Sequence, residues 1–268
     1  MPTLLVTGGA GTLGRILVAR ARSNGWGVRA TWWHRRPDVP ADVELVQADV
    51  RDLDALVSAA RGVDAIVHTA YRQGEDEWST NVDGSDVVAR AAAGARLIHL
   101  STDLVFDGTK GRYTEDDHPG AVSSYGWSKL AAERRVTAAC PDATLVRTSL
   151  IYGVPHGPQE RLAREGTRFY IDERRSPVHV DDLADALLEV VALDVPGPLH
   201  LGGADDVSRY DFAVLLGADP GRIERAHTSP DRAPDVTLDS ARAQSLLDTR
   251  LRGVYEVLDS SSAVRSAR

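Results

Sequence analysis

The feature that most constrains this sequence is a glycine-rich segment near its beginning, Thr7-Gly8-Gly9-Ala10-Gly11-Thr12-Leu13-Gly14. It follows Thr3 to Thr7, a short apolar and β-rich run of the kind that forms a buried parallel strand. It precedes Arg15 to Arg22, in which apolar residues recur at helical spacing. Strand, glycine turn and helix in this order indicate a dinucleotide site, although the glycine pattern alone also fits a turn without a ligand.

The glycines of this segment have separate roles in such a site. One allows a tight turn, one lets the backbone approach a pyrophosphate, and one lets the helix pack closely on the strand. The N–H groups at the start of the helix are free to bind phosphate. We therefore expect the dinucleotide to contact Gly8, Gly11, Thr12, Leu13 and Gly14.

The end of the second expected strand, Gly27 to Trp32, indicates which dinucleotide is favoured. A site selective for NAD usually places an Asp or Glu there to bind the ribose hydroxyls. Here the position holds Trp32, and Arg35 and Arg36 follow it. Arginine suits a 2′-phosphate because it is a permanent cation with fork-shaped donors. The sequence thus favours NADP(H) and leaves NAD(H) open, the alternative being that both arginines are ordinary surface charges.

Strand-like and helix-like segments alternate along most of the chain. The expected strands are Thr3–Thr7, Gly27–Trp32, Val43–Gln47, Ala65–Thr69, Arg96–Ser101, Ala143–Thr148 and Leu199–Leu201. The expected helices are Gly11–Ser23, Asp52–Arg61, Glu77–Ala93, Tyr125–Ala139, Val180–Leu193 and Arg209–Leu216. This alternation predicts an α/β fold, a Rossmann-type doubly wound parallel sheet.

From Ile151 onward the pattern breaks into short pieces punctuated by Gly and Pro. We expect an NADP-binding Rossmann domain over 1–150 and 177–202, and a small C-terminal substrate-binding part over 151–176 and 203–258. The polar segment 259–268 is expected to be a disordered tail.

A second motif, Tyr125 with Lys129 four residues later, indicates acid–base chemistry. Tyr125 opens an expected helix, so Lys129 lies one turn further along the same face. A free phenol has a pKa near 10, and a neighbouring ammonium lowers that pKa towards the working pH. Thr102, at the end of the fifth strand, can donate a hydrogen bond to a substrate oxygen as charge develops on it. We expect Tyr125 to give the proton in a carbonyl reduction. The alternatives are that Tyr125 and Lys129 form an exposed helical pair and that Thr102 merely ends a strand or caps a turn.

These residues resemble the extended branch of the short-chain dehydrogenase/reductase superfamily, over roughly residues 3 to 250. The resemblance implies that Asp49 and Val50 contact the adenine, that Thr69, Ala70 and Tyr71 line the cofactor, and that Lys129 also holds the cofactor ribose. It further implies that Asn81 supports the backbone and water structure of the active site. The motifs that carry it, besides the glycine segment and the Tyr-Lys pair, are Asp49-Val50 and Asn81-Val82-Asp83-Gly84.

Within that branch the sequence is similar to the dTDP-4-dehydrorhamnose reductase group. The similarity rests on Ser101-Thr102-Asp103-Leu104-Val105-Phe106-Asp107-Gly108, Val146 to Gly153, Ser176 to Ala184, Arg232-Ala233-Pro234 and Leu238-Asp239. It implies an NAD(P)H-dependent reductase of the 4-keto group of a nucleotide-linked deoxysugar. The sequence departs from the group in a short Pro155–Arg175 stretch and in Tyr71-Arg72-Gln73. A nucleotide diphosphate needs cations, for which the candidates are Arg161, Arg164, Arg168, Arg174, Arg175 and Arg232.

Two other functions remain open at this stage. The first is an NAD(P)-dependent sugar-nucleotide epimerase or dehydratase, which the missing acid after the second strand and the Arg35-Arg36 pair argue against. The second is a non-catalytic NADP-binding regulatory subunit, which occurs in this superfamily and which the complete set of Thr102, Tyr125 and Lys129 argues against.

Composition excludes several classes of protein. A net charge of −8 argues against a nucleic-acid partner, no apolar run reaches membrane-spanning length, and we find no metal-ligand spacing. Cys140 is the single cysteine, so no internal disulfide can form. Because Met1-Pro2-Thr3 leads directly into a strand, we expect no signal peptide and a cytoplasmic protein, with a homodimer left open.

Overall fold

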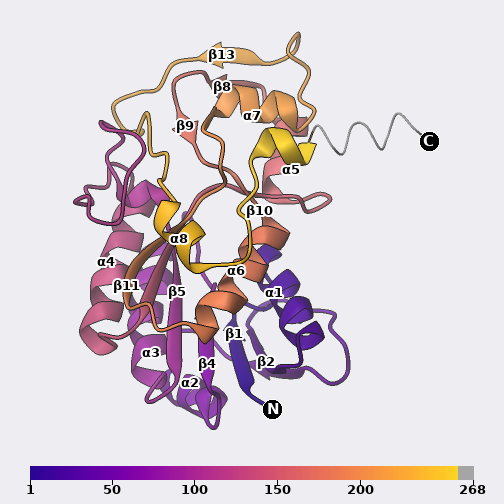
Figure 1. The fold of residues 1–268 in the computed structure, drawn as a ribbon, viewed down its shortest axis with the longest axis vertical. Helices are drawn as coiled ribbons and strands as arrows, with labels where there is room; N and C mark the ends of the chain where they lie inside the picture. The colour runs from indigo at the N-terminus through magenta and orange to yellow at the C-terminus, as the bar shows by residue number, and fades with distance from the viewer. Residues whose placement is uncertain (259–268) are drawn as a thin grey trace. The chain divides into compact units, whose positions relative to one another are not determined.

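The computed structural model describes residues 1–258, and its central feature is a seven-stranded sheet (Figure 1). The strand order is β11-β6-β5-β4-β1-β2-β3. The strands are β1 (Thr3–Thr7), β2 (Gly27–Trp32), β3 (Glu44–Gln47), β4 (Ala65–His68), β5 (Arg96–Thr102), β6 (Thr144–Thr148) and β11 (Gly197–Leu201). The pairs β1–β2, β1–β4, β2–β3 and β4–β5 are parallel. The predicted Rossmann-type α/β fold is confirmed.

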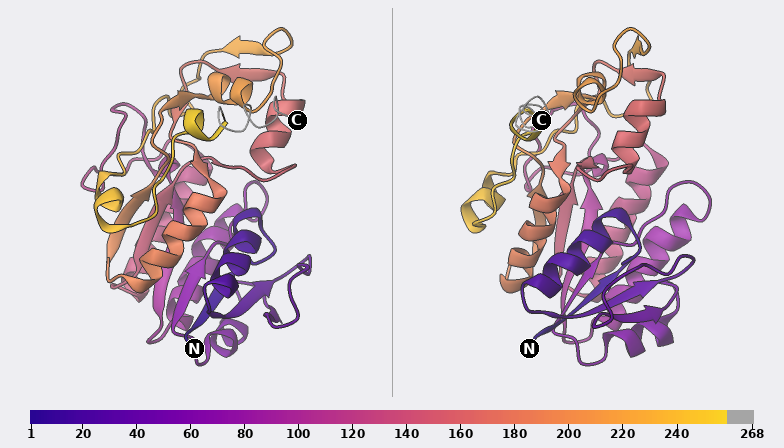
Figure 2. Two further views of the ribbon diagram at one scale, coloured as in Figure 1. Left: turned by 45° about the vertical axis from the view of Figure 1, so that its right-hand side comes forward. Right: turned by 90° about the vertical axis from the view of Figure 1, so that its right-hand side faces the viewer.

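Helices cover both faces of this sheet. They are α1 (Thr12–Ser23), α2 (Leu53–Ala60), α3 (Gly84–Ala91), α4 (Ser124–Ala139) and α6 (Val180–Ala192). Figure 2 shows α2, α3 and α4 together on one face, with α1 and the end of α6 on the other. The apolar runs of the strands explain this layering, because β4 is buried along its whole length and β1 in all but its first residue.

One predicted helix contains a local irregularity. The chain is helical from Glu77 to Ala91, as the pattern over Glu77–Ala93 predicts, but Ser79–Asp83 within this helix forms a wider π-type turn, η1, that continues into α3. The side chain of Asn81 both accepts from the backbone N–H of Arg72 (2.8 Å) and donates to its carbonyl (2.9 Å). Such turns recur at functional sites, and here the turn holds a buried amide against the segment that follows β4.

The described chain divides into two compact units. The first consists of Met1–Ser101, Ser124–Val146 and Leu187–Leu199; the second consists of Thr102–Ser123, Arg147–Ala186 and the described residues from His200. This division gives Thr102–Ser123 to the second unit, whereas the sequence assigned that stretch to the Rossmann domain. The predicted boundaries stay a prediction, and the predicted tail, 259–268, lies outside the described residues.

The second unit contains short elements that pack around small cores of their own. Its further elements are η2 (Asp103–Val105), β7 (Ile151–Tyr152), α5 (Pro158–Glu165), β8 (Arg168–Tyr170), β9 (Arg174–Arg175), β10 (Val178–His179), β12 (Val207–Ser208), α7 (Arg209–Leu215), β13 (Glu224–Ala226) and α8 (Ala241–Leu246). One core joins Tyr152, Val207 and Phe212; another joins Phe169 and Tyr210. Across the residues described, no helix is both long enough and apolar enough to cross a membrane.

Candidate functional site

The glycine segment forms a turn between β1 and α1 that tolerates no side chain at two positions. Gly8 has φ +75°, and a Cβ there would lie 2.8 Å from the backbone nitrogen of Ala70. A Cβ on Gly14 would lie 2.3 Å from the carbonyl oxygen of Gly8. Both glycines are therefore required, the first for the turn and the second for close packing of α1 on it.

The start of α1 presents unsatisfied backbone donors. Gly11 is the N-cap, and no side chain caps the helix at this end. Thr12 and Leu13 form its first turn, and Leu13 is buried. Free N–H groups at a helix start bind phosphate well, so the turn fits the pyrophosphate of a dinucleotide.

The ends of β2 and β4 flank this turn. The N–H of Gly9 donates to the carbonyl of Thr31 at 2.9 Å, next to Trp32 at the end of β2. The Thr69 hydroxyl donates to the carbonyl of Thr7 at 2.8 Å. The structure thus brings the expected contacts Trp32, Thr69 and Ala70 to the same edge of the sheet as the glycine turn.

The residues expected around the adenosine part of the dinucleotide have different surroundings. Arg35 and Arg36 are exposed, and neither has an ion-pair partner within residues 1–258, which leaves them free for a phosphate. Asp49 forms an ion pair with Arg51, whose guanidinium lowers the pKa of that carboxyl. Val50 is buried in the core below α3, where a Cβ on Gly84 would lie 2.7 Å from it.

Tyr125 and Lys129 lie on the first two turns of α4, as predicted. The ring of Tyr125 lies 6.0 Å from that of Tyr71, measured between centroids, and Tyr71 is largely exposed. Lys129 is 2% exposed, and its Nζ donates to the carbonyl of Leu100 at 2.7 Å. Because Ala70 lies against Gly8, the first unit brings the Tyr-Lys pair and the glycine turn to the same segment after β4.

Burial sets the charge state of Lys129 and its neighbours. Desolvation lowers the pKa of Lys129 to about 8, and the carboxylate of Glu133 opposes that shift. Burial also lowers the pKa of His68 to about 3, with the Lys129 charge adding to the effect, and holds that of His99 well below its usual value. Both imidazoles are therefore neutral near pH 7, and Lys129 is the cation of this buried group.

Asn81 connects η1 to α4. Its side-chain nitrogen donates to the hydroxyl of Ser128 at 2.9 Å, and that hydroxyl donates to the carbonyl of Tyr125 at 2.8 Å. Sequence reasoning named Asn81 but missed Ser128, although Ser128 lies inside the Tyr-x-x-x-Lys segment. His68 was also missed: its Nδ1 lies 2.6 Å from the Thr7 hydroxyl and its Nε2 lies 3.1 Å from the Ser85 hydroxyl.

Thr102 is the last residue of β5 and belongs to the second unit. Its hydroxyl accepts from the N–H of Leu104 at 3.3 Å and donates to a carboxylate oxygen of Asp103 at 3.1 Å. The hydroxyl therefore caps η2, the structural role that the sequence left open for it. A hydroxyl proton can rotate from Asp103 to another acceptor, so capping does not remove Thr102 from the candidate residues.

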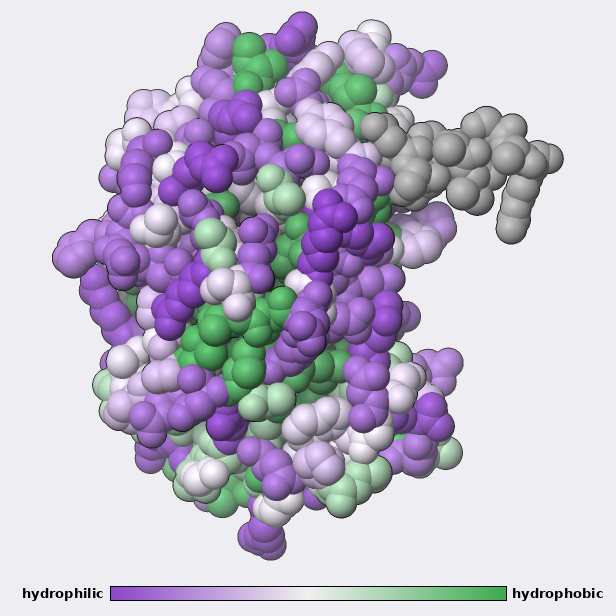
Figure 3. Space-filling model, in the orientation of Figure 1, coloured by the Kyte–Doolittle hydropathy of each residue, from purple (hydrophilic) through white to green (hydrophobic). Residues whose placement is uncertain are grey.

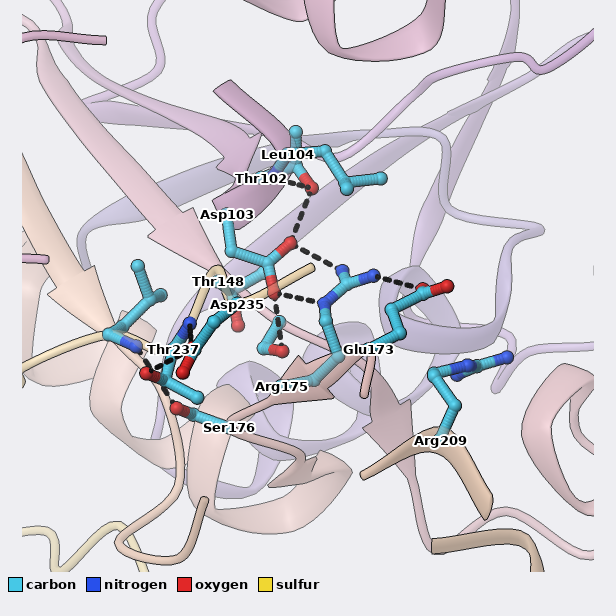
Figure 4. A network of polar contacts seen from close by, with 12 residues as sticks. Thr102, Asp103, Leu104, Thr148, Glu173, Arg175, Ser176, Arg209, Asp235 and Thr237 are labelled. Atoms are coloured by element: carbon cyan, nitrogen blue, oxygen red, sulfur yellow. Dashed lines mark hydrogen bonds and ion pairs between the residues drawn. The ribbon is translucent and has the colours of Figure 1, made fainter. Parts of the chain in front are cut away.

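The arginines considered for a nucleotide diphosphate divide into two groups. Arg161, Arg164, Arg168 and Arg174 are exposed, and the face of the second unit around β8, β13 and α7 is largely hydrophilic (Figure 3). Arg175 and Arg232 are instead bound by carboxylates. Asp103 binds the guanidinium of Arg175 (Figure 4). Glu173 accepts from Nε of Arg232 at 2.8 Å. The sequence did not predict this network, because Asp103 and Arg175 are 72 positions apart and no motif relates them.

Comparison with known proteins agrees with this arrangement. The family described as RmlD substrate binding domain matches residues 2–250 of the chain. The chain belongs to this family. The dTDP-4-dehydrorhamnose reductase of Mycolicibacterium smegmatis is 34% identical, over 97% of this chain and 85% of the relative. The resemblance to the extended short-chain dehydrogenase/reductase superfamily is thereby confirmed.

Two further relatives also match most of the chain. A protein of Streptomyces antibioticus named probable dTDP-4,6-dihydroxy-2-methyloxan-3-one 4-ketoreductase is 35% identical, over 86% of this chain and 82% of the relative. Among solved structures, a hypothetical dTDP-4-dehydrorhamnose reductase from Sulfolobus tokodaii superposes with a TM-score of 0.79 at 27% identity. That match covers 93% of this chain and 96% of the other, so the family's fold extends over both units.

Proposed function

We propose that this family member is an NADPH-dependent reductase of a carbonyl group, namely the 4-keto group of a nucleotide-linked deoxysugar. The observation that carries the proposal is that Tyr125 lies beside Tyr71. Tyr71 belongs to the segment after β4, and Ala70 of that segment contacts the glycine turn. A proton donor next to a dinucleotide site is the arrangement that carbonyl reduction needs.

The residues around the glycine turn fit a nicotinamide dinucleotide. The uncapped start of α1 suits the pyrophosphate, and the unpaired Arg35 and Arg36 suit a 2′-phosphate, so we assign NADP(H) as the preferred cofactor and retain NAD(H) as a weaker one. When bound, the cofactor supplies the hydride that reduces the carbonyl carbon. We place Asp49 and Val50 beside its adenine, and Thr69, Ala70 and Tyr71 along its length.

In this proposal Tyr125 and Thr102 act on the reacting oxygen, and Lys129 supports Tyr125. Tyr125 gives the proton that completes the alcohol, and the Lys129 ammonium favours the phenolate that remains. Thr102 donates a hydrogen bond to the same oxygen while negative charge develops on it. Lys129 reaches its position through α4 and is held there by the carbonyl of Leu100.

The substrate class rests on the relatives. Two of them, which are named for the reduction of dTDP-linked sugars, match more than four-fifths of this chain at 34% and 35% identity. We propose a dTDP-linked 4-keto-6-deoxysugar as the substrate.

Because the single Cys140 allows no internal disulfide, we also propose that the enzyme acts in the cytoplasm.

NADPH oxidation by the purified protein with dTDP-4-dehydro-6-deoxysugars tests this function. We expect turnover with NADPH, and a loss of at least about 100-fold in Tyr125→Phe with the affinity for NADPH unchanged. Turnover that persists in Tyr125→Phe would contradict the mechanism. NADPH binding without turnover on any keto-sugar would instead favour the non-catalytic regulatory subunit.

A further inference from the structure

Three charged residues, Glu173, Arg175 and Arg209, lie at the end of the β9–β12 ladder. The strands are antiparallel, with Ser208 opposite Arg174 and Val207 opposite Arg175. The N–H of Arg209 extends the ladder by donating to the carbonyl of Glu173 at 2.8 Å. Glu173 and Arg175 are close enough to Arg209 to act electrostatically on its guanidinium.

The carboxylates near Arg209 are already used by other arginines. Asp103 accepts from Nε of Arg175 at 2.7 Å and from the Ser149 hydroxyl at 2.6 Å. Glu173 lies 3.7 Å from Arg175 and accepts from Nε of Arg232 at 2.8 Å. Both carboxylates are almost completely buried, so neither can turn towards a different cation without breaking these bonds.

Arg209 is the cation that this network does not neutralise. Its only side-chain hydrogen bond among the described residues goes to the neutral amide oxygen of Gln159 at 3.0 Å. In Figure 4 no contact joins Arg209 to the charged residues drawn with it. The group thus contains three guanidinium groups, of Arg175, Arg209 and Arg232, but only two carboxylates, of Asp103 and Glu173. One positive charge is in excess.

This excess charge lies in an environment that disfavours it. Burial lowers the pKa of Arg209 to about 10, the positive charges of Arg175 and Arg232 add to that shift, and the carboxylates of Glu173 and Asp103 oppose it. Arg209 nevertheless remains charged near pH 7, and it is partly exposed, so a ligand can reach it. A desolvated guanidinium with most of its donors unused is the group that binds an anion most strongly.

We propose that Arg209, oriented by Gln159, binds a phosphate oxygen of the substrate's diphosphate. This inference rests on the proposed function for its substrate, a nucleotide-linked sugar. The exposed arginines of α5, β8 and β9 lack the desolvation that makes such a contact strong, and the charges of Arg175 and Arg232 are already balanced by Asp103 and Glu173. Arg209 is therefore a specificity residue for the nucleotide-linked form of the substrate.

Binding of dTDP, measured by calorimetry, tests this assignment without any turnover. In Arg209→Gln we expect dTDP to bind about 10- to 100-fold more weakly, because one charge-assisted contact is lost. Thymidine, which has no phosphate, should bind the variant and the wild type equally. Inorganic pyrophosphate should lose affinity like dTDP, and NADPH should keep its affinity. Equal dTDP affinity in both proteins would overturn the proposal.

Two further variants separate ligand binding from a structural role. Arg222→Gln, in the same unit at an exposed arginine paired with Asp219, should leave the dTDP affinity unchanged. Arg209→Lys keeps the charge without the planar fork and should weaken dTDP binding at an unchanged melting temperature. If both Arg209 variants lower the melting temperature of the ligand-free protein by several degrees, Arg209 is a structural residue and the proposal is wrong.

The two proposals fail in different ways. If the wild type reduces no keto-sugar but Arg209→Gln still weakens dTDP binding, the reductase fails and the phosphate contact stands. If the wild type turns over and Arg209→Gln binds dTDP normally, the reductase stands and the phosphate contact fails.

Discussion

At the scale of single residues, the candidate chemistry depends on a lysine that the fold has removed from water. Lysine occurs in this chain only at Lys110 and Lys129, so the Tyr-x-x-x-Lys motif is easily recognised in the sequence. The sequence does not reveal that Lys129 is held by the Leu100 carbonyl among neutral imidazoles. Those contacts join residues that are distant along the chain, and only the packing of α4 on the sheet brings them together.

This burial predicts an alkaline limb in the pH profile of NADPH oxidation. An ordinary lysine stays charged to about pH 10.4, but Lys129, with its pKa lowered to about 8, loses its charge as pH rises through that value. Since the ammonium supports Tyr125, the rate should fall above about pH 8. Lys129→Arg should move this limb to higher pH, since a guanidinium keeps its charge. If the rate of Lys129→Arg falls at the same pH as that of the wild type, the alkaline limb arises from another group.

At the scale of elements, the strands and helices of the sheet follow from the sequence, because their apolar periodicity is long and regular. Most of these strands and helices begin and end close to the predicted residues, as β2 and α1 do. The π-type turn at Ser79–Asp83 could not be predicted, because periodicity describes only the buried face of a helix. Within the turn, the amide of Asn81 bonds the backbone of Arg72.

The contact between α1 and the glycine turn gives a prediction at this scale. In Gly14→Ala the new Cβ would meet the backbone of Gly8 at 2.3 Å, so α1 must move away from the turn. We expect a loss of about 1–3 kcal/mol in the free energy of unfolding and at least tenfold weaker NADPH binding. Gly120→Ala is the control, because the nearest atom to its Cβ would be 4.0 Å away. Unchanged NADPH binding in Gly14→Ala would place the pyrophosphate elsewhere.

The segment after β2 gives a second prediction, about cofactor choice. Arg35→Ala combined with Arg36→Ala should weaken NADPH by about 10- to 100-fold, because two guanidinium contacts to the 2′-phosphate are lost. NADH has no such phosphate and should bind nearly as before. Affinities for both cofactors, measured by fluorescence titration, check this. An equal loss for NADPH and NADH would mean that these arginines do not select the phosphate.

At the scale of the whole molecule, the two units differ in how much of them the sequence predicts. The first unit is built from elements long enough to have a period. The second contains strands such as β7 and β10, each of two residues, in which no period can be recognised. Its charged network joins Asp103 to Arg175 and Glu173 to Arg232, and these pairings depend on the folded chain alone.

Transfer of deuterium from NADPH labelled at C4 of the nicotinamide to the sugar is the measurement that tests the central claim most directly. With a dTDP-4-dehydro-6-deoxysugar, a reductase must place the label on C4 of the sugar and release oxidised cofactor, and mass spectrometry and NMR of the product detect it. We predict a fully labelled product when the deuterium occupies the transferred face. A converted sugar that carries no label, with the cofactor still reduced, would contradict the account and indicate an epimerase or a dehydratase.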